Sequence, residues 1–226
     1  LRVVTDEMAA VETVSVGVWV AVGTRHEAKE QNGISHLLEH MAFKGTERRS
    51  AQAIVEEIED VGGHLNAYTG RENTAYFAKV LADDLPLAVD IIADILQNST
   101  FDEQELKRER AVIIQEIHQA QDTPDDIIFD HFQEAAFPDQ PMGRPVLGSA
   151  ELVEGMERQT IMDYMRGEYS AERIVLAAAG KLDHDAFVAA AEAAFTGLAQ
   201  NPEAAPEPLL YQGGEYREYR DLEQVH

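Results

Sequence analysis

Two histidines and a glutamate in the stretch His36-Leu37-Leu38-Glu39-His40 have the types and spacing of a metal-dependent hydrolytic site. Residues four apart on a helix lie on one face, with Cβ atoms about 6 Å apart. That separation lets two imidazole nitrogens reach one zinc ion at about 2.0–2.1 Å. Glu39 would point close to the metal without having to bind it, and a carboxylate there can accept a proton from a water molecule that the metal activates.

The order H-x-x-E-H is the reverse of the more common H-E-x-x-H and is typical of the zinc peptidases called inverzincins. The chain has 8 histidines in 226 residues, so a chance match is expected in roughly a few per cent of such chains. The alternative interpretation is a pair of surface histidines beside a solvated glutamate. The motif thus predicts a zinc site whose remaining ligand comes from elsewhere in the chain.

A catalytic zinc site has three protein ligands and one open position. The chain contains no cysteine, so the third ligand must be His, Asp or Glu. The best source is a predicted helix over residues 103–119, on which Glu109 and Glu116 are two turns apart and share a face. Three other histidines stay open as alternatives: His64, His118 and His131.

The composition is strongly acidic, with 42 Asp and Glu against 18 Lys and Arg and a formal net charge of −24. Such a surface disfavours nucleic acid and anionic membranes and suits a basic peptide, although acidity also serves solubility alone. No apolar run of 18 or more residues occurs, so we expect no membrane span. The sequence opens in a predicted strand without methionine, which leaves open whether a targeting segment precedes it.

Apolar periodicity and helix caps predict alternating strands and helices. Strands are predicted at 1–5, 14–22, 64–69, 74–81 and 173–179, of which the third and fourth form an antiparallel hairpin through a turn at 70–73. Residues 137–148 are predicted as loop. Helices are predicted from Asn32 or Ser35 to Phe43, from Ser50 to the pair Gly62-Gly63, from Asp84 through Leu96, from Glu103 to Gln119, from Thr123 through Phe132, from Arg158 to Tyr169 and from His184 to Phe195.

The end of the chain differs in composition from the rest. Residues 200–214 are rich in proline and glycine and are predicted to be a linker. A short strand is predicted from Tyr216 to Tyr219. We therefore expect a zinc-bearing domain over 1–199 and, in 215–226, the first strand of a second domain that this sequence does not contain.

The motif, followed 76 residues after His40 by Glu116, resembles the M16 (pitrilysin-type) metallopeptidases, and above all their β-type processing peptidases and short bacterial members. The resemblance extends over nearly the whole chain, through the segments 22–27, 65–69, 72–76, 109–113, 143–148 and 174–180. It implies an α+β domain in which a mainly antiparallel, twisted sheet carries its helices on one face.

The resemblance also implies roles for single residues. His36, His40 and Glu116 would bind Zn²⁺, Glu39 would activate water, and Glu109 would be an accessory acidic residue that supports the catalytic site. An extended substrate peptide would lie along an edge strand made of Leu65, Asn66, Ala67, Tyr68 and Thr69.

The implied function is that of a zinc-dependent endopeptidase acting on peptides or presequence-like segments. Its location would be the bacterial cytoplasm or, alternatively, the mitochondrial matrix. Family members close two homologous halves around the substrate, so we expect a C-terminal homologous half or a second M16 subunit as partner, in a homo- or heterodimer. Two alternatives stay open: a peptide-binding or assembly subunit without turnover, and an isolated half that is catalytically incomplete.

Overall fold

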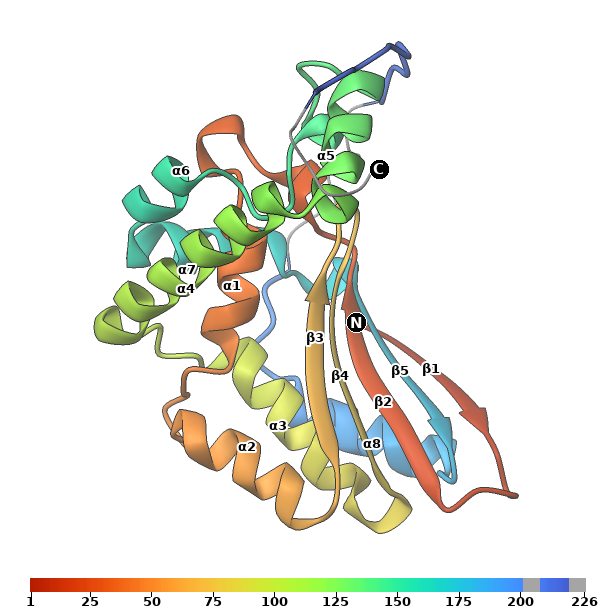
Figure 1. The fold of residues 1–226 in the computed structure, drawn as a ribbon. Coiled ribbons are helices and arrows are strands. Elements are labelled where there is room, and N and C mark those ends of the chain that lie inside the picture. The colour runs from red at the N-terminus through yellow and green to blue at the C-terminus, as the bar shows by residue number, and fades with distance from the viewer. Residues whose placement is uncertain (201–207, 220–226) are drawn as a thin grey trace.

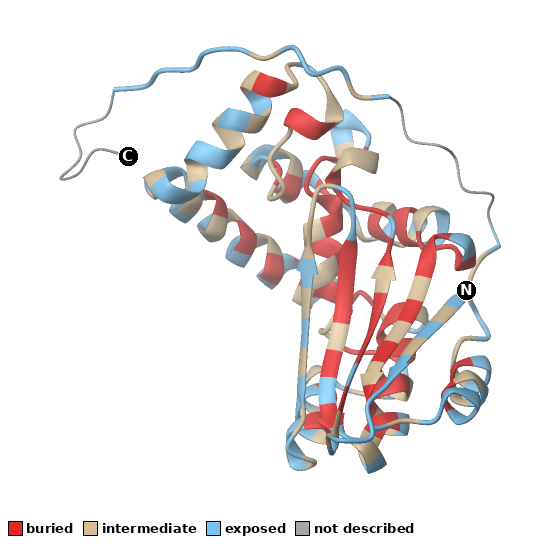
Figure 2. Cartoon of the chain, turned by 90° about the vertical axis from the view of Figure 1, so that its right-hand side faces the viewer, coloured by how far each residue is buried: buried red, intermediate tan, exposed pale blue. Residues whose placement is uncertain are grey.

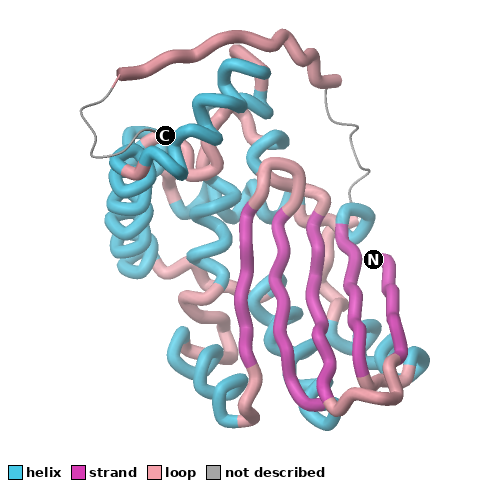
Figure 3. Tube along the Cα trace, turned by 45° about the vertical axis from the view of Figure 1, so that its right-hand side comes forward, coloured by secondary structure: helices cyan, strands magenta, loops and turns pink. Residues whose placement is uncertain are grey.

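A single five-stranded sheet forms one layer of the domain in the computed structural model, which describes residues 1–200 and 208–219. The spatial order of the strands is β1-β5-β2-β4-β3, as Figure 3 shows. β1 and β5 run parallel, and the other neighbouring pairs are antiparallel. The prediction of a mainly antiparallel sheet is confirmed. The strands are β1 (Arg2–Glu7), β2 (Thr13–Val20), β3 (His64–Thr69), β4 (Thr74–Leu81) and β5 (Ile174–Gly180).

The helices gather on one face of this sheet (Figure 1), as predicted. α3 packs against β2 and β4, α8 packs against β1, and α1 lies beside β3. The helix α6 was not predicted; it is short and begins where the Ser149 side chain accepts the N–H of Leu152. The helices are α1 (Ile34–Ala42), α2 (Ala51–Asp60), α3 (Leu85–Gln97), α4 (Glu103–Asp122), α5 (Pro124–Ala136), α6 (Ala150–Gly155), α7 (Arg158–Glu168) and α8 (His184–Ala194).

The core lies between the sheet and these helices. Along β2 every second residue is fully buried: Val14, Val16, Val18 and Val20. The residues between them are more exposed, apart from Gly17, and the alternation is visible along the strands in Figure 2. A sheet with one covered face has this period of two. The pattern fixes which face of each strand turns toward the helices.

The start of α1 is held by a residue outside the helix. Gly33 precedes α1 with a φ of 99°, a left-handed conformation that favours glycine, and a Cβ there would meet the Leu147 carbonyl oxygen at 2.8 Å. The buried Glu27 carboxylate accepts the N–H of Gly33 and the N–H of Ser35, each at 2.9 Å. A carboxylate at a helix N-terminus satisfies free N–H groups and complements the helix dipole. Glu27 therefore sets where α1 begins.

The loop after α1 is tied to α3 through Asp94, whose side chain is fully buried. Its carboxylate accepts hydrogen bonds from Thr46 at 2.8 Å, from Arg48 at 3.1 Å and from Arg49 at 2.9 Å. Burial alone would raise the pKa of Asp94, but these hydrogen bonds and one from Asn98 outweigh it, so that the pKa is lowered. Both ends of α1 are therefore anchored.

Residues 208–219 run along α5 without regular secondary structure. The N–H of Gln212 donates to the Ala136 carbonyl at 3.0 Å, and the Tyr216 ring stacks on His131 with centroids 4.3 Å apart. The strand predicted from Tyr216 to Tyr219 is not formed, because no described strand lies beside it to pair with its main chain.

The predicted linker and second domain fall partly on 201–207 and 220–226, which lie outside the described residues, so the domain division stays a prediction. No helix in the described part of the chain is both long enough and apolar enough to cross a bilayer.

We expect Asp94→Asn to lower the free energy of unfolding by about 3 kcal/mol at pH 7, because the largely buried Arg49 loses the one fully buried carboxylate among its three partners. The folded-state pKa of Asp94 is lowered, so its contribution is present above about pH 4 and is lost as the pH falls through that folded pKa. The difference between wild type and variant should therefore narrow in acid, as denaturant titrations from pH 7 to pH 3 would measure.

Asp90→Asn is the matched control for this experiment. Asp90 pairs with the same two arginines, but its side chain is 40% exposed. A partly exposed ion pair contributes up to about 1 kcal/mol. Equal losses of stability in the two variants would contradict the role given to Asp94.

Candidate active site

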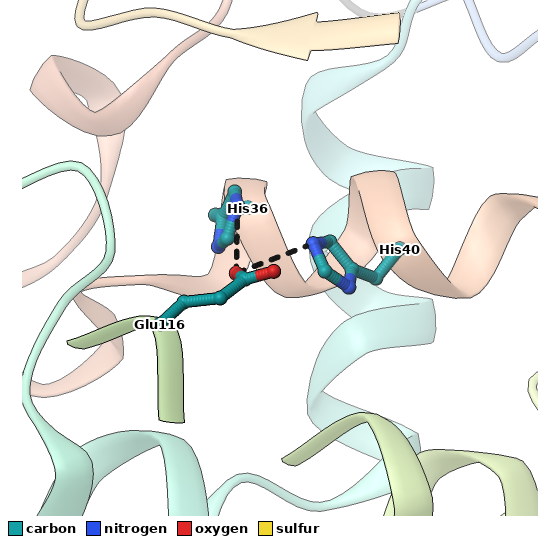
Figure 4. A group of neighbouring side chains, drawn as sticks. All are labelled: His36, His40 and Glu116. Atoms are coloured by element: carbon teal, nitrogen blue, oxygen red, sulfur yellow. Dashed lines mark ion pairs between the residues drawn. The ribbon is translucent and has the colours of Figure 1, made fainter. Parts of the chain in front are cut away.

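The three predicted ligand residues converge between α1 and α4, as Figure 4 shows. Nε2 of His36 lies 3.8 Å and Nε2 of His40 lies 3.7 Å from the same Oε2 of Glu116. One possible ligand atom from each residue lies within 4.8 Å of the other two. Ligand atoms around a tetrahedral zinc ion are about 3.4 Å apart, given metal–ligand bonds of about 2.1 Å. The spacing therefore fits a small metal ion after slight adjustment.

The alternative third ligands lie elsewhere. His64 and His118 are exposed, and His131 contacts Tyr216 and Glu218 of the C-terminal segment. Over residues 1–200 and 208–219, no second group of three such side chains comes as close together. Of the candidates in the sequence, only Glu116 meets the two histidines of the motif.

The chemistry of the donors also fits zinc. Burial, together with the smaller effect of the neighbouring His40, lowers the pKa of His36 to about 4. The His36 ring is therefore neutral at pH 7, which is the form that binds a metal. The side chains of His36 and His40 are 13% and 18% exposed and that of Glu116 is 39% exposed. Two imidazoles and a carboxylate with one side open to solvent correspond to the His₂Glu set of catalytic zinc sites.

Glu39 lies on the same helix but outside this group of three. Its Oε2 accepts a hydrogen bond from the Thr69 hydroxyl at 2.5 Å. Burial raises the pKa of Glu39, although the hydrogen bond from Thr69 and the nearby His40 oppose this effect. A carboxylate whose pKa is closer to neutrality is a better proton acceptor near pH 7. The arrangement can supply a base beside the metal ligands.

Glu109 contacts the ring nitrogen of His40 that does not face Glu116. Its Oε2 lies 2.9 Å from His40 Nδ1, and its Oε1 lies 2.7 Å from the Lys44 ammonium. Burial alone would raise the pKa of Glu109, but the hydrogen bonds from Lys44 and His40 outweigh it and lower the pKa. A carboxylate on the far nitrogen of a metal-binding histidine fixes the ring orientation and tautomer. Glu109 is therefore placed to position His40 and does not join the three ligand atoms.

β3 is an edge strand, because β4 is its only neighbour in the described sheet. Leu65, Ala67 and Thr69 turn toward the helices, whereas Asn66 and Tyr68 are exposed. The N–H of Ala67 donates to Oδ1 of Asn66 at 2.8 Å, so a side chain covers one main-chain donor of this edge. The predicted substrate residues thus form a strand edge that can accept another extended peptide.

Three contributions to the site were not predicted: the Glu27 cap, the Lys44 ion pair and the hydrogen bond from Thr69 to Glu39. Lys44 lies four residues after His40, and this spacing could have indicated a shared side of the helix end. Glu27 lies in a loop before α1, and Thr69 lies on a strand 30 residues after its partner Glu39. No local sequence pattern indicates either contact.

Comparison with known families agrees with this geometry. The model of the family described as Insulinase (Peptidase family M16) matches residues 2–150. The chain is 43% identical over 225 residues to an "Uncharacterized zinc protease" of Rickettsia felis, covering 100% of this chain and 55% of that protein. It is 42% identical over 206 residues to the mitochondrial-processing peptidase subunit beta of Saccharomyces cerevisiae, covering 91% of this chain and 45% of that protein. The chain spans about half the length of the curated relatives it matches.

Solved structures share the fold. A protease from Helicobacter pylori superposes with a TM-score of 0.85 at 22% identity, covering 92% of this chain and 51% of that one. A peptidase M16 inactive domain from Pseudomonas fluorescens also gives a TM-score of 0.85, at 17% identity and the same coverage. These likenesses bear on the α+β fold alone. The family model matches more than half of this chain, and the chain therefore belongs to peptidase family M16.

Proposed function

We propose that the chain is the zinc-bearing half of a metalloendopeptidase in which His36, His40 and Glu116 bind Zn²⁺. The observation that carries this proposal is the convergence of one ligand atom from each of these residues within 4.8 Å. Membership of the M16 family and a relative named as a zinc protease support it. Glu39, which lies beside the three residues, is the proposed base.

Zinc in this position would polarise the scissile carbonyl and lower the pKa of water. Glu39 accepts the proton that the attacking water loses as its oxygen bonds to the carbonyl carbon. The same carboxylate then delivers this proton to the leaving amine as the C–N bond breaks. Burial of Glu39 supports the role, because it raises the pKa of the carboxyl group and makes the carboxylate more basic.

The proposed substrate is a peptide that lies extended along β3, over Leu65, Asn66, Ala67, Tyr68 and Thr69. Pairing of this kind uses main-chain groups, so selectivity would be broad. The formal net charge of −24 favours basic peptides, presequence-like segments included.

The relatives are about twice as long as this chain, and one is named a subunit. We therefore propose that a C-terminal homologous half or a second M16 subunit completes the site. The proposed location is the bacterial cytoplasm or, alternatively, the mitochondrial matrix, in line with the Rickettsia and mitochondrial relatives.

A second candidate function is peptide or zinc binding without turnover. One structural neighbour is named an inactive domain, and a half without its partner would also be inactive. Comparing zinc-dependent cleavage of a mixed basic-peptide panel by this chain and by the full-length protein separates these cases, since a binding subunit would cleave in neither form.

Glu39→Gln in the full-length protein should leave zinc bound and reduce kcat by at least about 10²–10⁴-fold, the range for loss of a general base. Metal analysis and peptide cleavage with and without chelator measure the two effects. Glu59→Gln, at an exposed position of α2, is the control with an equal change of charge. Substantial zinc-dependent cleavage by Glu39→Gln would rule out Glu39 as the base.

Glu116→Gln should weaken zinc binding itself, because the metal loses its only anionic ligand. The expected loss of affinity is larger than the 10–100-fold, in order of magnitude, that follows removal of a group behind a ligand. Competition with a chromophoric chelator gives the affinity. Glu103→Gln, an exposed change in the first turn of α4, is the control. Wild-type affinity in Glu116→Gln would show that Glu116 is not a ligand.

Glu109→Gln should lower zinc affinity by about 10–100-fold, because His40 loses the carboxylate that orients its ring. Lys44→Met should have a smaller effect in the same direction, since Lys44 touches only Glu109 in this cluster. The same chelator competition measures both. If Glu109→Gln matched Glu116→Gln in its loss of affinity, Glu109 would have to be counted among the ligands.

A further inference from the structure

We propose that Thr69 is a positioning residue that fixes the Glu39 carboxylate and links its position to β3. The proposal rests on the function proposed above, in which Glu39 is the base and β3 receives the peptide. In this proposal the Thr69 side chain holds the Glu39 carboxylate, and only the main chain of Thr69 pairs with the substrate.

The geometry connects the two elements directly. Thr69 is the last residue of β3, and its side chain turns toward α1. Its hydroxyl donates to Oε2 of Glu39 at 2.5 Å and lies 3.4 Å from the carbonyl oxygen of Ser35. A hydroxyl has one proton to donate, and the shorter contact with the charged acceptor is the stronger bond.

Glu39 depends on this donor for its orientation. Within residues 1–200 and 208–219, the Thr69 hydroxyl is the one group that donates a hydrogen bond to the Glu39 side chain. A glutamate side chain loses rotamer entropy when it is held in one conformation, so it needs a bond to stay there. A bond from Thr69 occupies Oε2 and leaves Oε1 to take up the proton of the attacking water.

The strand itself holds Thr69 in place. Thr69 pairs with Thr74 of β4, whose buried hydroxyl donates to the Val22 carbonyl at 2.9 Å. The other edge of β3 carries no strand in the described sheet. A peptide that pairs along that edge would order the main chain from Leu65 to Thr69, and through Thr69 it would fix the base. Peptide binding and base alignment thus share one residue but use different parts of it.

The test is steady-state cleavage by the full-length protein carrying Thr69→Val, which removes the hydroxyl but keeps the shape and the β-branched side chain. We expect kcat to fall by about 10–100-fold, as for loss of a hydrogen bond to a charged group. KM and the zinc affinity from chelator competition should stay at wild-type values, and the variant should remain folded at the assay temperature. Thr69→Ser restores the donor and should restore kcat.

Thr5→Val is the matched control, because Thr5 lies on β1 at the opposite edge of the sheet and its hydroxyl is hydrogen-bonded to His184, outside the proposed site. Wild-type kcat in Thr69→Val, a rise in KM at unchanged kcat, a loss of zinc affinity, or no recovery in Thr69→Ser would each overturn the proposal. If the wild type shows no zinc-dependent cleavage, or Glu39→Gln cleaves normally, the proposed function fails and this inference fails with it.

Discussion

The fixed position of α1 against α4 is the constraint on which the site depends. Three candidate ligand atoms from two helices lie within 4.8 Å of one another, so a shift of α1 by one residue would separate them. Glu27 holds the first N–H groups of α1, and the buried Asp94 holds the loop that follows it. Glu27 and Asp94 therefore fix the position of α1, because a buried polar group with several hydrogen-bond partners holds the backbone in one conformation.

Two glutamates beside the candidate ligands have pKa values shifted in opposite directions. Glu39 faces a neutral hydroxyl, and burial raises its pKa. Glu109 is also buried, but the Lys44 ammonium and His40 lower its pKa below the ordinary value. A carboxyl group with a raised pKa exchanges protons readily near neutrality, whereas one with a lowered pKa keeps its charge. One residue type is thereby suited to two tasks near His40.

The sequence predicted the five strands and most helices, because these follow from local periodicity. Helix geometry offered Glu109 and Glu116 alike as a third ligand, and the resemblance to the M16 peptidases singled out Glu116. The sequence did not reveal α6, a helix of only six residues capped by Ser149. Nor did it reveal the Thr69 hydroxyl, since its partner lies 30 residues away on another element. A strand was expected from Tyr216 to Tyr219, but a segment cannot form one without a neighbouring strand to pair with its main chain.

The pairing of β1 with β5 has a consequence for the order in which the domain folds. Arg2 lies opposite Val175, so this pair closes a loop of 173 residues. Contacts between such distant residues form late and slow folding, because the entropy of the loop must be lost first. The segments that bear the histidines and Glu116 all lie within it, so they leave the ribosome before β5 does. The site can begin to assemble on a sheet whose last strand has not yet been synthesised.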